Sequence, residues 1–139
     1  MKKTQFFIYI FALITLSQSV SQSDVVSCVK KQVGKPYISG GIGPKGFDCS
    51  GLAYYCHKKA IPRSPLEQSK SGTYVAKSDL KPGDLMFWNT SGNKVSHTSI
   101  FMGNGQMIHA PLPGKNVKLV SYNTNYWKNR YVTGRRYWK

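Results

Sequence analysis

Phe47-Asp48-Cys49-Ser50-Gly51-Leu52 is the stretch where a glycine-rich loop gives way to a predicted helix, which we expect to run to about Ala60. Asp48 is a natural N-cap for that helix, because its side chain can accept from the free backbone N–H groups of the first turn. Cys49 follows at the point where backbone donors and the helix dipole favour negative charge. We therefore expect the Cys49 thiol to ionise more readily than its reference pKa of about 8.5 suggests, which makes it the candidate nucleophile. The alternative is a small, buried structural cysteine.

A base for this nucleophile has to come from the three histidines of the chain. His97 opens an apolar strand-like run over 97–103, and His109 lies in a second run. His57 sits near the end of the predicted helix, where a polar residue suits the helix dipole. The pattern fits a nucleophile, a base in His97 and an orienting residue in His109. The alternative is that both strand histidines are hydrogen-bonded packing residues.

The turn at Gly103-Asn104-Gly105 decides whether the two histidines can cooperate, because side chains alternate faces along a strand. A regular two-residue loop sends His97 and His109 to opposite faces of the hairpin. A three-residue loop puts His109 opposite Ser99, on the same face as His97. Cooperation between the histidines therefore requires an odd loop or a bulged strand.

The order of the predicted elements indicates an α+β domain. Helices come first, over residues 25–33, 49–60 and 64–72, the last of them announced by a capping serine, Ser64, with Glu67 at the capping-box position. Short apolar runs broken by turn residues follow. We expect the N-terminal helices to pack on one face of an antiparallel sheet of five to six strands, formed by residues 84–88, 97–102, 107–110, 117–122 and 131–138.

The N-terminus has the features of a secretory signal peptide. Lys2 and Lys3 precede an apolar stretch over 6–16, which is too short for the roughly 20 residues of a membrane-spanning helix. Small residues around position 20 suit a signal peptidase, and we place the cut after Ser21. We thus expect a signal peptide over 1–21 and a single catalytic domain over 22–139. The protein would be secreted, extracellular or in the cell envelope, with no stable membrane anchor.

The chain is strongly basic, with a formal net charge of +15. The predicted mature chain lacks Lys2 and Lys3, so that 18 basic and 5 acidic residues leave a charge of +13. Such an excess indicates attraction to a polyanion such as an anionic cell surface, although a merely solvated surface is the alternative. Because no nucleic-acid-binding module accompanies the charge, we expect no nucleic-acid partner.

The three cysteines allow a nucleophile plus one disulfide between Cys28 and Cys56. We favour the alternative, in which Cys28 and Cys56 are buried apolar thiols on helices. No Cys-x-x-Cys or His-x3-His spacing occurs, so we expect no metal site and no cofactor.

Blocks of sequence along most of the chain resemble the NlpC-type, papain-like cysteine peptidases that cut the peptide stems of bacterial cell walls. The blocks occur in the same order as in that family: 34–41, 47–52, 61–63 with Gln68, 80–85, 96–103 and 107–111. The resemblance implies a papain-like fold. It also implies that Cys49 attacks a peptide carbonyl, that His97 shuttles the proton and that His109 orients His97.

Further site residues are implied by the same resemblance. Tyr37 matches a family tyrosine near the catalytic centre, which helps to hold the substrate or the oxyanion. Asp48 and Ser50 match positions that hold the free amine of the stem peptide, although for Asp48 an N-cap alone would suffice. Arg63 and Gln68 are expected to be structural or rim residues.

The resulting hypothesis is a monomeric, secreted cysteine endopeptidase that acts on peptidoglycan stem peptides. The resemblance implies cleavage between the γ-carboxyl of D-glutamate and the diamino acid that follows, and the anionic cell wall is the expected partner. Two alternatives remain open. One is an amidase or acyltransferase on the same scaffold, and the other is a catalytically silent protein that binds the cell wall.

Overall fold

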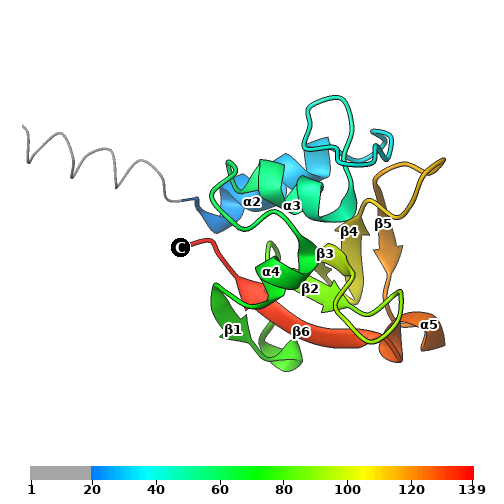
Figure 1. The fold of residues 1–139 in the computed structure, drawn as a ribbon. Helices are drawn as coiled ribbons and strands as arrows, with labels where there is room; N and C mark the ends of the chain where they lie inside the picture. The colour runs from blue at the N-terminus through cyan, green and yellow to red at the C-terminus, as the bar shows by residue number, and fades with distance from the viewer. Residues whose placement is uncertain (1–19) are drawn as a thin grey trace, which may run out of the picture.

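A computed structural model describes residues 20–139 and shows helices packed against a six-stranded antiparallel sheet with strand order β1-β6-β2-β3-β4-β5 (Figure 1). The predicted α+β, papain-like architecture is confirmed. The helices are α2 (Gln22–Lys31), α3 (Cys49–Cys56), α4 (Pro65–Ser69) and α5 (Asn125–Lys128). The strands are β1 (Thr73–Val75), β2 (Leu85–Trp88), β3 (His97–Gly103), β4 (Gln106–His109), β5 (Lys118–Ser121) and β6 (Tyr131–Arg136).

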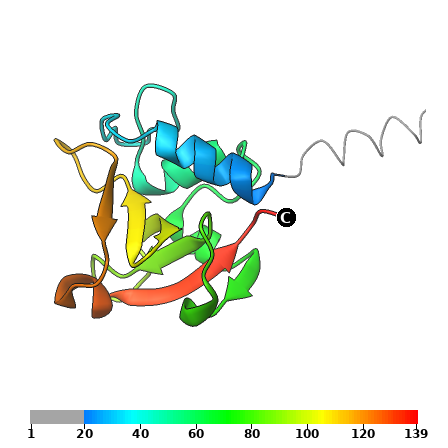
Figure 2. The same cartoon turned by 180° about the vertical axis from the view of Figure 1, so that it is seen from behind.

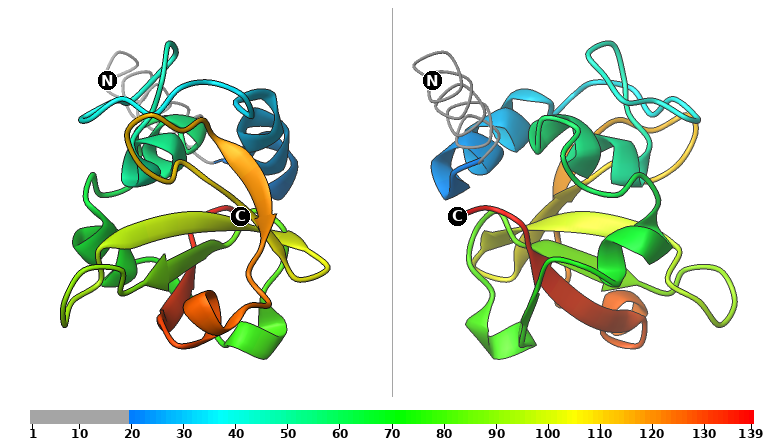
Figure 3. Two further views of the ribbon diagram at one scale, coloured as in Figure 1. Left: turned by 90° about the vertical axis from the view of Figure 1, so that its right-hand side faces the viewer. Right: turned by 60° about the vertical axis from the view of Figure 1, so that its left-hand side comes forward.

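The sheet has an apolar cluster on each face. Leu85 and Phe87 of β2 point toward α2 and α3, whereas Met86 and Trp88 point to the opposite face. Figure 2 shows α2 crossing the helix-covered side, and Figure 3 shows α5 at the opposite side of the sheet. The helix α5 and the edge strand β1 were not predicted, because four- and three-residue elements are too short to display a periodicity.

The helix α2 begins at Gln22, three residues before the predicted helix start at residue 25. Ser21 is its N-cap and forms a capping box with Asp24, whose backbone N–H donates to the serine hydroxyl over 3.1 Å. Val20 is buried, and its carbonyl accepts from the backbone N–H of Lys139 over 3.0 Å. The predicted signal peptide otherwise lies outside the described residues. Val20 and Ser21 therefore belong to the folded domain, although both precede the predicted cut.

A disulfide joins Cys28 of α2 to Cys56 at the end of α3, with the two Cα atoms 5.5 Å apart. The prediction that both cysteines are free, buried thiols is wrong. The two helices pack directly against each other, and that contact brings residues 28 positions apart to bridging distance.

The helix α3 ends at Cys56, four residues before the predicted end at Ala60, because Lys58 and Lys59 leave the helix in left-handed conformations with φ of 54° and 61°.

None of the helices within residues 20–139 is both long enough and apolar enough to cross a membrane.

The short helix α4 begins as predicted: the Ser64 hydroxyl accepts from the backbone N–H of Glu67 over 3.3 Å and also contacts the Glu67 carboxylate. The helix α4 ends at Ser69, before the predicted end near residue 72, and the chain then turns into β1.

Candidate active site

Cys49 is the first residue of α3, and the preceding loop holds it there. The Asp48 side chain caps the helix as predicted and accepts from the backbone N–H of Gly51 over 2.6 Å. Gly51 lies so close to the carbonyl of Gly41 that a Cβ atom would collide with it. The close approach of the loop to the first turn of α3 therefore requires glycine at position 51.

The pKa of the Cys49 thiol is raised above its ordinary value, chiefly because surrounding protein desolvates this half-buried side chain. Backbone N–H groups of Thr98, Ser50 and Cys49 itself oppose that shift but do not overcome it. The expectation that this thiol ionises more readily than usual is therefore wrong, because desolvation outweighs the helix N-terminus. The sulfur needs a base at the moment of attack. The hydrogen bond from the backbone N–H of Thr98 also places the Cys49 sulfur beside β3, at the residue that follows His97.

His97 and His109 form the predicted pair, with His97 Nε2 and His109 Nδ1 2.9 Å apart. Gly103 pairs with Gln106 across a two-residue turn, but the register shifts between Phe101 and Gly103. This bulge restores the register of a three-residue loop, in which Ile100 faces Ile108. The bulged-strand condition for cooperation is thus confirmed, and both histidines lie on the face of the sheet opposite α3.

The histidine pair is buried, and His97 and His109 are only 5% and 4% exposed. Burial lowers the pKa of His97 to about 3, with a contribution from His109. Burial also lowers the pKa of His109 to about 4, with a contribution from the nearby Lys118 ammonium. Both rings are therefore neutral at pH 7. If His97 Nε2–H donates to His109 Nδ1, the other nitrogen of His97 is free to accept a proton.

Trp127 of α5 covers the histidine pair. Its ring stacks on His97 with a centroid distance of 5.7 Å and an interplanar angle of 29°. It meets His109 edge-on at 5.5 Å and also packs against Trp88 at 4.8 Å. No sequence pattern assigned Trp127 to the site, because α5 was not predicted. It supplies much of the apolar surroundings that keep the histidines neutral.

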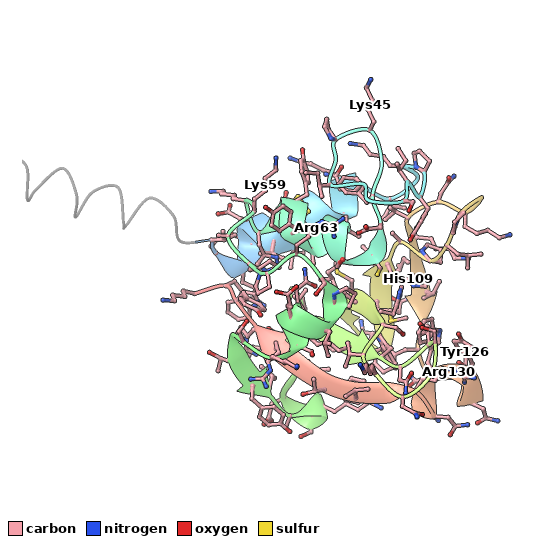
Figure 4. The ribbon with its side chains drawn as sticks, in the orientation of Figure 1. Lys45, Lys59, Arg63, His109, Tyr126 and Arg130 are labelled. Atoms are coloured by element: carbon pink, nitrogen blue, oxygen red, sulfur yellow. A yellow bond between two sulfur atoms is a disulfide. The ribbon has the colours of Figure 1, made fainter. Side chains whose placement is uncertain are left out.

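Arg63, expected at the rim, is part of the site. Its guanidinium binds the Asp48 carboxylate through two hydrogen bonds of 2.6 and 3.1 Å and donates to the Ser50 hydroxyl over 2.8 Å. Tyr37 lies in the same corner: burial raises its pKa, and the charges of Cys49 and Asp48 raise it further. Asp48 therefore serves as N-cap and ion-pair partner together. Figure 4 shows Arg63 on the helix side of the molecule and His109 on the side of β4 and β5.

Gln68 links three elements of the site from a fully buried position. Its amide nitrogen donates to the carbonyls of Ser50 and Pro62 over 3.1 and 2.8 Å, and its amide oxygen accepts from the Thr98 hydroxyl over 3.0 Å. Thr98 follows His97 on β3. Its hydroxyl completes a bridge from α4 to α3 and β3, which fixes the cysteine relative to the strand that carries His97.

Within residues 20–139, no group of three or more His, Cys, Asp or Glu side chains is arranged to hold a metal ion. Cys49 is the free cysteine of this part of the chain. The arrangement is suited to nucleophilic catalysis by a thiol, with a neutral imidazole as base and a second imidazole as its orienting partner.

Comparison with known proteins gives consistent matches. The NlpC/P60 family model matches residues 34–136. Murein DD-endopeptidase MepH of Escherichia coli K12 is 40% identical over 114 residues, which cover 76% of this chain and 42% of that protein. A γ-D-glutamyl-L-lysine dipeptidyl-peptidase of Bacillus cereus is 37% identical over 119 residues, covering 82% of this chain and 36% of the relative.

The fold matches as well. The crystal structure of an NlpC/P60 family protein from Bacillus cereus aligns with a TM-score of 0.79 and 34% identity over 87% of this chain and 41% of that one. This chain thus spans less than half the length of each of these three proteins.

Proposed function

The chain belongs to the NlpC/P60 family, and we propose that it is a cysteine endopeptidase that hydrolyses the stem peptides of peptidoglycan. The observation that carries this proposal is the 2.9 Å pairing of His97 with His109, on the strand whose next residue, Thr98, contacts the Cys49 thiol through its backbone. The names of the E. coli and B. cereus relatives, both of which refer to peptidases, support it.

The chemistry follows from the protonation states. Because the resting thiol and the resting imidazole are both neutral, His97 takes the Cys49 proton as the sulfur attacks the peptide carbonyl. We assign the backbone N–H of Cys49 as a donor to the oxyanion. His97 then gives its proton to the leaving amine, which leaves an acyl-enzyme. Water, deprotonated by His97, hydrolyses that thioester and regenerates the thiol.

The preference for one bond comes from the family resemblance, and the corner formed by Tyr37, Asp48, Ser50 and Arg63 supports it. A carboxylate held by Arg63 keeps acceptor capacity for the free amine of a short stem peptide. We propose that the amine is anchored there and that the γ-carboxyl of the second residue, D-glutamate, reaches Cys49. We therefore propose the γ-D-glutamyl–diamino acid bond, in keeping with the name of the B. cereus relative rather than that of the DD-endopeptidase.

Export and wall binding belong to the same proposal. The predicted signal peptide and the Cys28–Cys56 disulfide both suit an oxidising compartment outside the cytoplasm. The excess of basic residues would hold the domain on an anionic wall, and salt should weaken that attachment.

Digestion of purified peptidoglycan tests the proposal. Wild type should release fragments with a new free amine on the diamino acid, and Cys49→Ala should lower the rate by several orders of magnitude. His57→Gln, which changes a histidine outside the site, is the matched control and should retain activity. Release of stem peptides with a new free amine on their first residue, L-alanine, would indicate an amidase. Cleavage that survives Cys49→Ala would overturn the assignment of the nucleophile.

A further inference from the structure

A cavity of about 430 Å³ adjoins the histidine pair on the side away from α3. His97 and His109 form one wall, and the loop after β4 contributes Leu112. The remaining walls come from β5 and from α5, whose Trp127 stacks on His97. The cavity thus adjoins the two histidines, but neither Cys49 nor the corner formed by Tyr37, Asp48, Ser50 and Arg63 contributes to its lining.

The proposed mechanism determines which part of a substrate this cavity faces. His97 donates a proton to the leaving amine, so the leaving part of the peptide must pass beside its ring. The acyl part is attached to Cys49 and extends toward the Asp48–Arg63 pair. The cavity beside His97 and His109 therefore lies on the leaving side, where the diamino acid and any residue after it would sit.

Lys118 is the charged residue among those that line the cavity, because both histidines are neutral. It pairs directly with His109 across β4 and β5, so that the two side chains lie on the same face of the sheet. The proximity is also evident in His109, whose pKa the Lys118 charge lowers. Among the cavity-lining residues of the described range 20–139, none is acidic, so none neutralises this ammonium group.

The other walls suit an aliphatic chain. Leu112 and Tyr126 are about half exposed, at 53% and 48%, and thus offer apolar surface where they line the cavity. Arg130 holds the Tyr126 ring in place, with its guanidinium carbon 3.9 Å from the ring centroid and a 2.8 Å hydrogen bond to the Tyr126 carbonyl. Figure 4 shows Tyr126 of α5 and Arg130, which follows that helix, on the same side of the molecule as His109.

We propose that this cavity is the leaving-side subsite and that Lys118 selects stem peptides whose leaving part carries a free carboxylate. The methylene chain of the diamino acid packs between Leu112, Tyr126 and Trp127, and the carboxylate pairs with the Lys118 ammonium. This proposal rests on the proposed endopeptidase function and adds a charge requirement to it. Substrates in which that carboxylate is amidated are poor substrates.

Two pairs of synthetic peptides test the charge requirement. The first compares L-alanyl-γ-D-glutamyl-L-lysine as free acid and as C-terminal amide. The second compares lysine with meso-diaminopimelate as third residue, both with amidated α-carboxyl groups. Wild type should prefer the carboxylate-bearing member of at least one pair by about tenfold in kcat/KM. The pair that shows the preference identifies which carboxylate Lys118 binds.

Lys118→Gln should abolish that preference, lowering kcat/KM about tenfold for the carboxylate substrates and no more than about twofold for the others. Lys115→Gln makes the same charge change three residues earlier, at an exposed side chain that does not line the cavity, and should leave the preference intact. Equal losses on all peptides would overturn the proposal, because Lys118 would then act through His109. The proposal would also be overturned if the wild-type enzyme cleaved carboxylate-bearing and amidated peptides equally well.

A binding measurement separates this proposal from the proposed function. Tryptophan fluorescence of Cys49→Ala, titrated with the same peptides, reports binding without hydrolysis. Tighter binding of the carboxylate peptides that is lost in Cys49→Ala/Lys118→Gln supports the subsite, and equal binding of acid and amide overturns it. Failure of wild type to cleave any of the peptides would instead overturn the proposed function.

Discussion

Mild acid should destabilise this protein through its histidine pair. The pKa values of His97 and His109 are about 3 and about 4 in the folded state. In the unfolded chain both return to about 6.5. Between these values the unfolded state binds protons that the folded state does not, so the free energy of unfolding falls as the pH falls. The contribution is fully present above about pH 7 and is lost progressively toward pH 3.

The magnitude at pH 5 hardly depends on the folded pKa values, because both lie well below 5. Each histidine should cost about 2 kcal/mol between pH 7 and pH 5, or about 4 kcal/mol for the pair. That is a large part of the roughly 5–15 kcal/mol by which a typical domain is stable. Burial lowers the pKa of His57 as well, so this histidine also reduces the free energy of unfolding as the pH falls.

Urea unfolding at pH 7 and pH 5, followed by tryptophan fluorescence, measures this loss. His109→Gln removes one titrating group, so its stability should fall by about 2 kcal/mol less over this interval than that of wild type. Lys115→Gln, which changes an exposed charge and no histidine, is the control and should follow wild type. If His109→Gln lost stability as steeply as wild type, burial of a neutral His109 would not be the source of the pH dependence.

Three further predictions concern the scaffold. Replacing both Cys28 and Cys56 by serine opens a disulfide that spans 28 positions and should lower the free energy of unfolding in urea by about 4 kcal/mol; unchanged stability would contradict a structural role for the bridge. Gly51→Ala should lower stability by about 2 kcal/mol and impair peptidoglycan cleavage, because the new Cβ meets the Gly41 carbonyl; wild-type behaviour in both assays would show that the loop yields easily. N-terminal sequencing of the exported protein should return Val20, since Val20 is buried and Ser21 caps α2, whereas a start at Gln22 would support the originally predicted cut.

Local sequence signals predicted much of the scaffold of the site. Asp48 was identified as the cap of the helix that begins with Cys49, and Ser64 as the cap of α4, because capping depends on residues within one helical turn. The strands that carry His97 and His109 were predicted from short apolar runs bounded by turn residues. The hairpin between them was recognised from its glycines, and its geometry was reduced to two alternatives.

Other features depended on contacts between distant segments. The pairing of Arg63 with Asp48 joins residues 15 positions apart, and the Thr98–Gln68 hydrogen bond joins residues 30 apart. The expected lowering of the Cys49 pKa was wrong. A helix start favours the thiolate, but tertiary packing desolvates the thiol, and the sequence does not show that packing. Trp127 escaped notice because it lies on a four-residue helix whose role is evident only from what it covers.

The sequence by itself determined the helix start that presents Cys49, the strands that carry the histidines and the family to which these blocks belong, because each depends on neighbouring residues or on their order. The tertiary structure alone decided that the strand bulges, which puts His97 and His109 on one face and 2.9 Å apart. It also decided that Cys28 and Cys56 form a disulfide and that thiol and imidazoles are neutral. Strand register, proximity and desolvation are set by packing between segments far apart in the chain, and no local pattern encodes them.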